Sequence, residues 1–408
     1  MYGHWSFSWV QIIAHNKGVL LSVLSLLSLG LIMGLMNLEQ SISPLSWGLL
    51  LGSIVLMSLA MAKLLDSLKA AVLQLGLSFY ILAMTLGALG WLGLVLDEKA
   101  MLGLVILMTV MTSNLVHILS TLLREMSRGL FQYDAVAEAL KFNSSPIFLA
   151  NFTTLLGFAF AAWYEPELAT MAWIVGIGVA ISYFTTLSWL PLILLKWLLE
   201  FRVGSHADRY GYAFVATWMQ NSPGLLKLVL VLFTVGFVGL LWSAQGLLPL
   251  LNELAGMLIF MGVLFMLFWK SLTLAIANTL ANLLALTLTV AVFYLLSANA
   301  SISLLLLMVP MGLIVDDGIH FFSRYVRAKQ GLFSDSTSAV RYAMASVGRP
   351  IWMTSWIVMI GLMVLLFSPQ AAVQQASFIT MISLVFATVI ILFIIPAFLT
   401  KQPNLNKP

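Results

Sequence analysis

ISLLLLMVPMGLIVDDGIHFF, residues 302–322, places two adjacent aspartates, Asp316 and Asp317, inside an otherwise apolar run. About 20 apolar residues is the length that a helix needs to cross the hydrocarbon core of a bilayer. Asp316 lies 15 residues after Ser301 and 8 before Arg324, which places it roughly 22 Å from one membrane surface and about 12 Å from the other. The stretch therefore predicts a membrane-spanning helix with acidic groups near mid-membrane.

The composition extends this prediction to the whole chain. Of 408 residues, 62% are hydrophobic and 8% are charged, and the mean hydropathy is +1.05, whereas soluble domains contain about 25% charged residues. The absence of cysteine excludes a disulfide scaffold, a thiolate metal site and a cysteine nucleophile. No GxxxxGK[ST] phosphate loop occurs, so ATP bound to this chain cannot power transport.

We predict twelve membrane-spanning helices. Helices are expected because backbone groups in lipid must be satisfied within their own segment. The twelve apolar runs are Val19–Met36, Leu45–Leu64, Ala70–Leu96, Ala100–Leu122, Ile147–Trp163, Leu168–Leu194, Leu225–Leu241, Leu254–Phe268, Leu274–Leu296, Ile302–Phe322, Ile351–Phe367 and Ala371–Leu399.

The basic residues predict the orientation. An even number of spans puts both termini on one side, and with a cytoplasmic N-terminus all but Lys99 of the 19 Lys and Arg residues are cytoplasmic. This distribution follows the positive-inside rule. The outer connections instead carry acids: Glu39, Asp97, Glu98, Glu165, Glu167 and Glu253. We therefore predict a multi-pass protein of a bacterial-type inner (cytoplasmic) membrane, with both termini cytoplasmic.

The predicted domains follow from these spans. Residues 1–18 are expected to form an amphipathic interfacial helix, with Trp5, Trp9, Ile12 and Ile13 on one face; a frayed tail is the alternative. These residues lack the early apolar core of a cleavable signal peptide. The remaining divisions are a first six-helix repeat (19–199), a cytoplasmic linker with an interfacial helix (200–223), a second six-helix repeat (224–400) and a cytoplasmic tail (401–408).

The two repeats are inferred from an internal similarity at an offset of about 204 residues. Residues 66–68 (DSL) match 270–272 (KSL), and residues 116–120 (VHILS) match 319–323 (IHFFS). Prolines match as well, in the pairs Pro146 and Pro350, and Pro191 and Pro396. The halves have the same orientation, which predicts an axis along the membrane normal. Duplicated spans are typical of transporters, although a duplicated scaffold that moves nothing is the alternative.

Asp316 and Asp317 are the only ionisable residues clearly inside the predicted hydrocarbon region. A carboxylate there costs ~2.5–3.5 kcal/mol or more, so its presence indicates a function. Desolvation and a like-charged neighbour both favour the protonated carboxyl, and two such groups titrate as a coupled unit. Because no basic residue is available in the membrane to neutralise the pair, we expect at least one to be protonated at rest.

The expected relay partners are polar residues at a similar depth. His320 lies one turn away from the acids. It either passes a proton or forms hydrogen bonds at the membrane interface, and we favour the second interpretation. In the first half, Ser113 aligns with Asp316, Asn114 with Asp317 and His117 with His320. Other spans add Asn151, Thr153, Thr154, Thr354 and Ser355. A single Ser or Thr is more typical of helix packing, but a symmetry that brings the two fourth spans together favours a site. The sequence offers no metal constellation and no nucleophile with a base.

Residues 315–325 (VDDGIHFFSRY) resemble the fourth-span signature of resistance–nodulation–division (RND) exporters, particularly the MMPL and "predicted exporter" branch. The first half is similar at VHIL (116–119), REM (124–126), PIFL (146–149) and TTLLGF (153–158). The resemblance covers nearly the whole chain. It implies an RND-type membrane domain, driven by the proton-motive force, that exports lipids or other hydrophobic molecules, with Asp316 and Asp317 carrying the proton step.

The sequence departs from this family in three places. Family members usually insert a large extracytoplasmic porter domain where this chain has only Asn37–Pro44 and Ser243–Leu250. Those domains are naturally missing, were removed, or are supplied by a partner. Asn114 stands where the branch often has an acid, so only the second half can bind the proton. The Thr153-Thr154 pair is replaced by Ile357-Val358 in the second half.

The leading hypothesis is a secondary transporter, with protons as the coupling ion and no other cofactor. Its expected partners are membrane lipids and a hydrophobic small-molecule or lipid substrate. A protein that supplies periplasmic domains is a further candidate partner, and nucleic acid is not expected. A non-transporting lipid-binding or assembly module, like the sterol-sensing domains, is the alternative. An enzyme is not expected, because an intramembrane aspartyl protease needs its carboxylates on separate elements, whereas Asp316 and Asp317 are adjacent.

Overall fold

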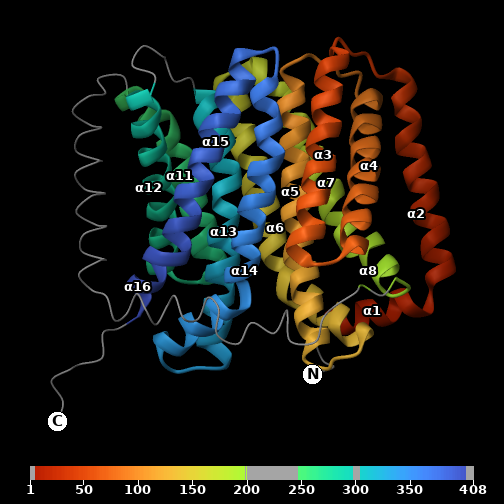
Figure 1. Ribbon diagram of the computed structural model, residues 1–408, viewed down its shortest axis with the longest axis vertical. Helices are drawn as coiled ribbons and strands as arrows, with labels where there is room; N and C mark the ends of the chain where they lie inside the picture. Colours follow the sequence, from red (N-terminus) through yellow and green to blue (C-terminus); the bar gives the residue numbers. More distant parts are fainter. Residues whose placement is uncertain (1–4, 198, 200–246, 297–303, 401–408) are drawn as a thin grey trace. The chain divides into compact units, whose positions relative to one another are not determined.

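The computed structural model describes residues 5–197, 199, 247–296 and 304–400, with the backbone alone at 247–253, 294–296, 304–306 and 308. These residues are helical apart from short connections and a bridge between Gln40 and Leu96 (Figure 1). Nine helical segments of this part are long and apolar enough to cross a membrane, and Leu254–Trp269 is a shorter apolar helix. The chain is therefore a multi-pass, helical membrane protein. The predicted span Leu225–Leu241, the linker 200–223 and the tail 401–408 lie outside the described residues.

The helices keep the labels of Figure 1. In chain order they are α1 (Trp5–His15), α2 (Lys17–Ile32), η1 (Met33–Asn37), α3 (Pro44–Leu65), α4 (Leu68–Trp91), α5 (Ala100–Ser127), α6 (Gln132–Tyr164), η2 (Pro166–Leu168), α7 (Ala169–Leu187), α8 (Trp189–Leu194), α11 (Leu247–Trp269), α12 (Leu272–Leu296), α13 (Leu304–Gly331), α14 (Ser336–Met363), η3 (Val364–Phe367), α15 (Ala371–Val389), the π-helical η4 (Ile390–Ile394) and α16 (Ile395–Leu399).

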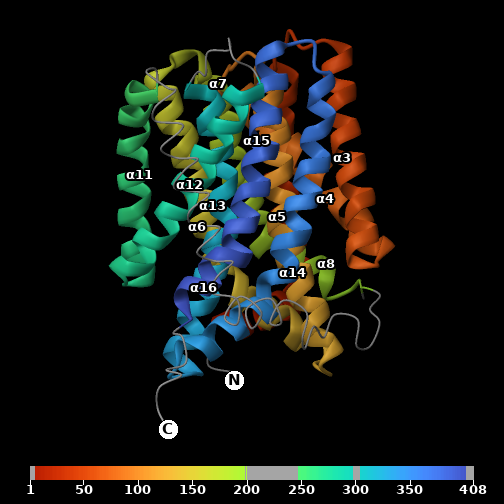
Figure 2. The same ribbon diagram turned by 60° about the vertical axis from the view of Figure 1, so that its left-hand side comes forward.

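The described chain divides into two compact units: residues 1–207 with 353–378, and residues 208–352 with 379–408. In the first unit, α5 packs against α3, α4, α6 and α7, and its most apolar stretch is wholly buried. In the second unit, α11, α12 and α13 pack against one another, and η4 contacts both α12 and α13 (Figure 2). The acid-bearing helix α13 thus contacts three other elements of its own unit.

Two helices begin 15 residues before the apolar runs that predicted them. The runs beginning at Ile147 and Ile351 are the second parts of α6 and α14, which continue through Pro146 and Pro350. A proline removes one backbone hydrogen bond and tends to kink a helix. Both helices are nonetheless continuous, so each apolar run and the stretch before it form one helix.

Matched turns in the two halves have the same local conformation. Asp66 and Lys270 are the two non-glycine residues with positive φ in the described chain, at 53° and 52°. Each is followed by a serine whose hydroxyl oxygen accepts from a backbone N–H three residues on, Ser67 from Ala70 and Ser271 from Leu274. A left-handed residue ends one helix and a serine cap begins the next.

The N-terminal helix α1 forms over Trp5–His15, within the segment where a helix was predicted. Nε1 of Trp9 donates to the carbonyl of Leu187 at 2.8 Å, and Ile13 packs in a buried cluster with Leu24 and Leu192. Trp5 and Ile12, in contrast, are exposed. Of the four expected residues, one pair therefore contacts the first unit and the other pair is exposed, and the position of α1 at the membrane interface stays a prediction.

Candidate functional site

The predicted acids lie on α13 in different surroundings. Asp317 is buried, with 4% of its surface exposed, while the side chain of Asp316 is 17% exposed. Oδ1 of Asp316 lies 3.3 Å from Nε2 of His320, one turn along the helix. His320 is itself buried, and so is Arg324 one turn further on. The structure thus places His320 as an intrahelical partner of Asp316.

Asp317 contacts Thr388 on α15, a residue that sequence reasoning did not select. The Thr388 hydroxyl lies within donor distance of two acceptors, Oδ2 of Asp317 at 3.3 Å and the carbonyl oxygen of Leu384 at 2.7 Å. A hydroxyl has one proton, so it donates to one acceptor at a time. When it donates to Leu384, its lone pairs are available to a protonated Asp317. The site can therefore accommodate both protonation states of the acid.

The backbone after Thr388 departs from α-helical geometry. Ile390–Ile394 forms the π-helical turn η4, and Pro396 follows in the first turn of α16. Proline has no N–H to donate to the carbonyl four residues earlier, and a widened turn before it accommodates the lost bond. π-helical turns are frequent at functional sites. The residue that contacts Asp317 thus stands at the start of an irregular segment.

In the first unit, Asn114 stands where the second has Asp317, and it forms an amide pair. Nδ2 of Asn114 donates to Oδ1 of Asn151 on α6 at 2.9 Å, and Nδ2 of Asn151 donates to the carbonyl of Val179 on α7 at 3.3 Å. Ser113 and His117 are buried on the same helix. The predicted residues Asn114 and Asn151 therefore come together, in a contact that links three helices without a titratable group.

The predicted hydroxyl residues in the first unit are also buried. Thr153 and Thr154 both donate to the carbonyl of Ala150, at 2.9 Å in each case. Such bonds to the preceding turn are the usual way for a threonine to be satisfied within a helix. Thr354 and Ser355 are buried on α14, in the part assigned to the first unit. Their predicted pairing with the acids of the second unit stays a prediction.

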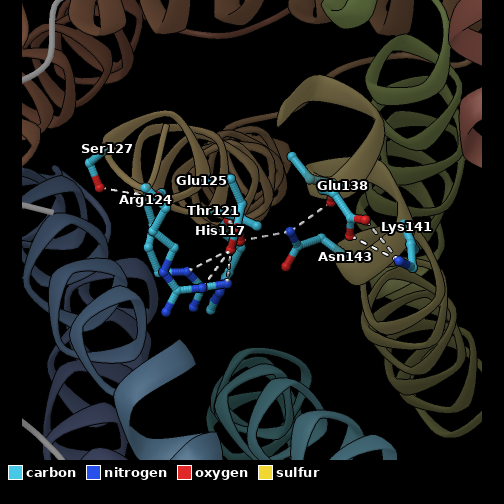
Figure 3. A network of polar contacts seen from close by, with 10 residues as sticks. His117, Thr121, Arg124, Glu125, Ser127, Glu138, Lys141 and Asn143 are labelled. Carbon is cyan, nitrogen blue, oxygen red and sulfur yellow. Dashed lines mark hydrogen bonds and ion pairs between the residues drawn. The ribbon is translucent and has the colours of Figure 1, made fainter. Parts of the chain in front are cut away.

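A polar network extends from His117 toward the start of α6 (Figure 3). The Thr121 hydroxyl donates to the backbone carbonyl of His117 at 2.9 Å, and Nδ2 of Asn143 donates to Oγ1 of Thr121 at 3.0 Å. Buried Arg124 lies 3.0 Å from Glu125. Because a buried charge is strongly unfavourable without a partner, this pairing explains how Arg124 and Glu125, part of the motif resembling RND exporters, are tolerated in the interior.

At the other end of this unit, the connection between α2 and α3 is tied to the one between α4 and α5. The Ser41 N–H donates to the backbone carbonyl of Leu96 at 2.8 Å, and the Leu96 N–H donates to the backbone carbonyl of Glu39 at 3.0 Å. The Glu98 carboxylate accepts from the Ser43 amide at 2.5 Å and the Ser46 hydroxyl at 2.6 Å. Burial raises the pKa of Glu98, but these hydrogen bonds lower it more, so the pKa is below its ordinary value. A short ordered connection closes this end of the unit.

No protein-family model and no curated protein sequence matches this chain. The fold is nevertheless similar to that of SecDF. The chain matches SecDF in its super-membrane-facing form with a TM-score of 0.68 over 87% of its length at 16% identity. It matches SecDF from Thermus thermophilus, a translocon-associated membrane protein, with a TM-score of 0.69 over 86% at 15% identity. In both comparisons the chain spans 61% of the SecDF chain. The chain therefore has a SecDF-like membrane-protein fold.

Proposed function

We propose that this protein is a secondary transporter of RND type, driven by the proton-motive force, in which Asp316 and Asp317 form the proton relay. The observation that carries the proposal is the contact between buried Asp317 and Thr388, beside the pair formed by Asp316 and His320. The RND-like motif and the SecDF-like fold support it. A scaffold without transport has no need of two acids in a buried helix.

Thr388 gives the protonation of Asp317 a mechanical consequence. With Asp317 protonated, the acid donates to Thr388 and the hydroxyl donates to Leu384, so all three groups are satisfied. With Asp317 charged, the hydroxyl turns to the carboxylate, and the Leu384 carbonyl loses that bond. Gain or loss of one proton thereby changes the hydrogen bonds that Thr388 makes on α15, immediately before η4. We infer that proton binding shifts α15 relative to α13.

The adjacent acids have different roles in this scheme. Asp317 is the group whose charge α15 detects, while Asp316 and His320 exchange a proton along one turn of α13. The energy available is adequate, because one charge crossing 100 mV yields ~2.3 kcal/mol. That energy would drive one six-helix half against the other, in a protein with both termini cytoplasmic. The same conformation at the matched turns, Asp66 and Lys270, supports the two-repeat organisation.

We propose a hydrophobic molecule, most simply a lipid, as the exported substrate, and an inner membrane as the location. The MMPL-like motif supports this substrate class, and exposed apolar side chains of the spans, such as Leu26, Leu59 and Val263, would contact lipid directly. Adjacent acids on one helix do not form the shared-proton dyad of an aspartyl protease, which favours transport over hydrolysis.

A non-transporting lipid-binding or assembly module is the second candidate. The observation that favours it is the short connection from Leu38 to Ser43, tied by hydrogen bonds to Leu96 and Glu98. The related exporters usually carry a porter domain at this point. A protein without that domain needs a partner for periplasmic handling of substrate, or has no such step.

Proton flux in proteoliposomes discriminates between the two candidates. Parent protein and the Asp316→Asn and Asp317→Asn variants are reconstituted under an imposed pH gradient and voltage, and internal pH is followed with a fluorescent dye. Thr354→Val is the companion variant for a predicted relay partner. We expect flux in the parent and its loss in Asp317→Asn. Equal flux in the parent and Asp317→Asn contradicts the relay, and a folded parent without flux favours the lipid-binding module.

A further inference from the structure

Asn278 on α12 is a fully buried polar residue, with 0% of its surface exposed. Its side chain meets α13 at Gly318, the residue after Asp317: a Cβ added to Gly318 would lie 2.0 Å from Oδ1 of Asn278. Among the residues that the structure describes, neither the oxygen nor the nitrogen of this amide has a hydrogen-bond partner. Gly318 therefore lets an unsatisfied amide reach the backbone beside Asp317.

A buried polar group that has no protein partner is usually satisfied by an internal water. A buried amide without a partner loses the hydrogen bonds that it would make in water, and buried polar atoms are nearly always bonded to protein or to ordered water. An internal water makes about three hydrogen bonds, to groups otherwise unsatisfied. Asn278 offers both a donor and an acceptor. Asp317 is the nearest residue in sequence to Gly318 that offers a further partner, and α12, α13 and η4 all contact one another.

Thr388 reaches Asp317 from α15, and its hydroxyl also contacts the backbone carbonyl of Leu384, which does not take up a proton at physiological pH. Asn278 lies on a different helix, α12, so a water that it holds would leave the contact between Asp317 and Thr388 undisturbed.

We propose that Asn278 holds an internal water against Asp317, and that this water delivers the proton to the acid. The inference rests on the proposed function. When a hydronium ion occupies the position, one O–H bond of the hydronium breaks, a new O–H bond forms on a carboxylate oxygen of Asp317, and neutral water stays on Asn278. Release is the reverse step. Asn278 does not ionise and acts as a positioning residue, and Gly318 provides the room.

The test uses two readouts on the full chain. The first is a high-resolution structure of the parent and of Asn278→Leu, in which an apolar side chain of similar size replaces the amide. The second is the proteoliposome flux of Asn278→Leu and Gly318→Ala. Gln74→Leu is the matched control, since Gln74 is the corresponding buried amide of the first half: its nitrogen donates to Ser78 and Thr112, and only its oxygen has no partner among the described residues. We expect density for one water between Asn278 and Asp317 in the parent alone. Without the bridge, we expect flux about tenfold slower or more.

The outcomes separate this inference from the proposed function. Parent density without a water at Asn278 overturns the inference, and so does normal flux in both Asn278→Leu and Gly318→Ala. A flux loss as large in Gln74→Leu as in Asn278→Leu assigns the effect to packing and also overturns it. If instead Asp317→Asn transports protons as the parent does, the proposed function fails, while the density still decides whether Asn278 holds the water.

Discussion

At the scale of the residue, Thr388 has one hydroxyl proton and two acceptors within reach, Asp317 at 3.3 Å and Leu384 at 2.7 Å. We expect Thr388→Val to slow proton flux by about tenfold or more, because a hydrogen bond to a charged group contributes about 1.5–3 kcal/mol and about 1.4 kcal/mol corresponds to tenfold in rate. The measurement is the initial rate of dye acidification in proteoliposomes. Thr388→Ser restores the hydroxyl without the methyl group and should restore the rate. Equal rates in all three proteins contradict a role for this hydroxyl.

The acids themselves were predictable from the sequence, and Thr388 was not. Two carboxylates in an apolar run are conspicuous because burying them is unfavourable, so Asp316 and Asp317 identify themselves. A threonine in a span is ordinary helix-packing material, and only the packing of α15 on α13 distinguishes Thr388 from the others. Asn278 was not predictable either, because its role depends on Gly318, which faces it from the neighbouring helix α13. Sequence spacing reveals which residues are neighbours on one helix, but not which residues of different helices are in contact.

Glu98 provides a residue-scale prediction outside the membrane. Its pKa is lowered by bonds from Ser46 and Ser43 in spite of burial, so its stabilisation is complete above the unfolded pKa of 4.5 and is lost as the pH falls through the lower folded pKa. We expect Glu98→Gln to lower stability at pH 7 by about 1 kcal/mol, typical of a lost helix cap. Thermal unfolding in detergent at pH 7 and below pH 4 measures this. The difference should shrink at the acidic pH, and exposed Glu39→Gln should show little effect at either.

At the scale of the element, α2 and η1 cross α4 at glycines. A Cβ on Gly87 would lie 2.2 Å from the Leu31 carbonyl oxygen, whereas one on Gly76 of the same helix would meet nothing within 4 Å. Gly87→Ala should therefore destabilise the protein by about 1–3 kcal/mol through overpacking. Gly76→Ala should be neutral or stabilise it by up to about 1 kcal/mol, since alanine is the better helix former. Thermal unfolding of the two variants in one detergent compares them, and equal shifts would contradict the close helix contact.

The elements also show where sequence patterns end. Hydropathy located the described spans because apolar length is what a bilayer demands. It did not locate the helix starts at Gln132 and Ser336, since a proline inside a helix looks like a boundary in sequence and only tertiary packing decides whether the helix continues. For α1, helical spacing placed Trp5 and Trp9 on one face, and only the structure shows that Trp9 bonds to the helix end at Leu187.

At the scale of the whole molecule, the charge distribution predicts the orientation. Because the sequence contains no cysteine, a single introduced cysteine reports the orientation without labelling at any other position of the chain. Glu167 is an exposed residue between α6 and α7, and Gln330 is exposed at the end of α13. With both termini cytoplasmic, a membrane-impermeant maleimide added to intact cells should label Glu167→Cys and leave Gln330→Cys unlabelled until the membrane is permeabilised. Labelling with the reverse pattern would contradict the orientation, and with it the direction from which protons reach Asp317. Labelling of both in intact cells would contradict the predicted number of spans between them, because an odd number of crossings separates the two positions.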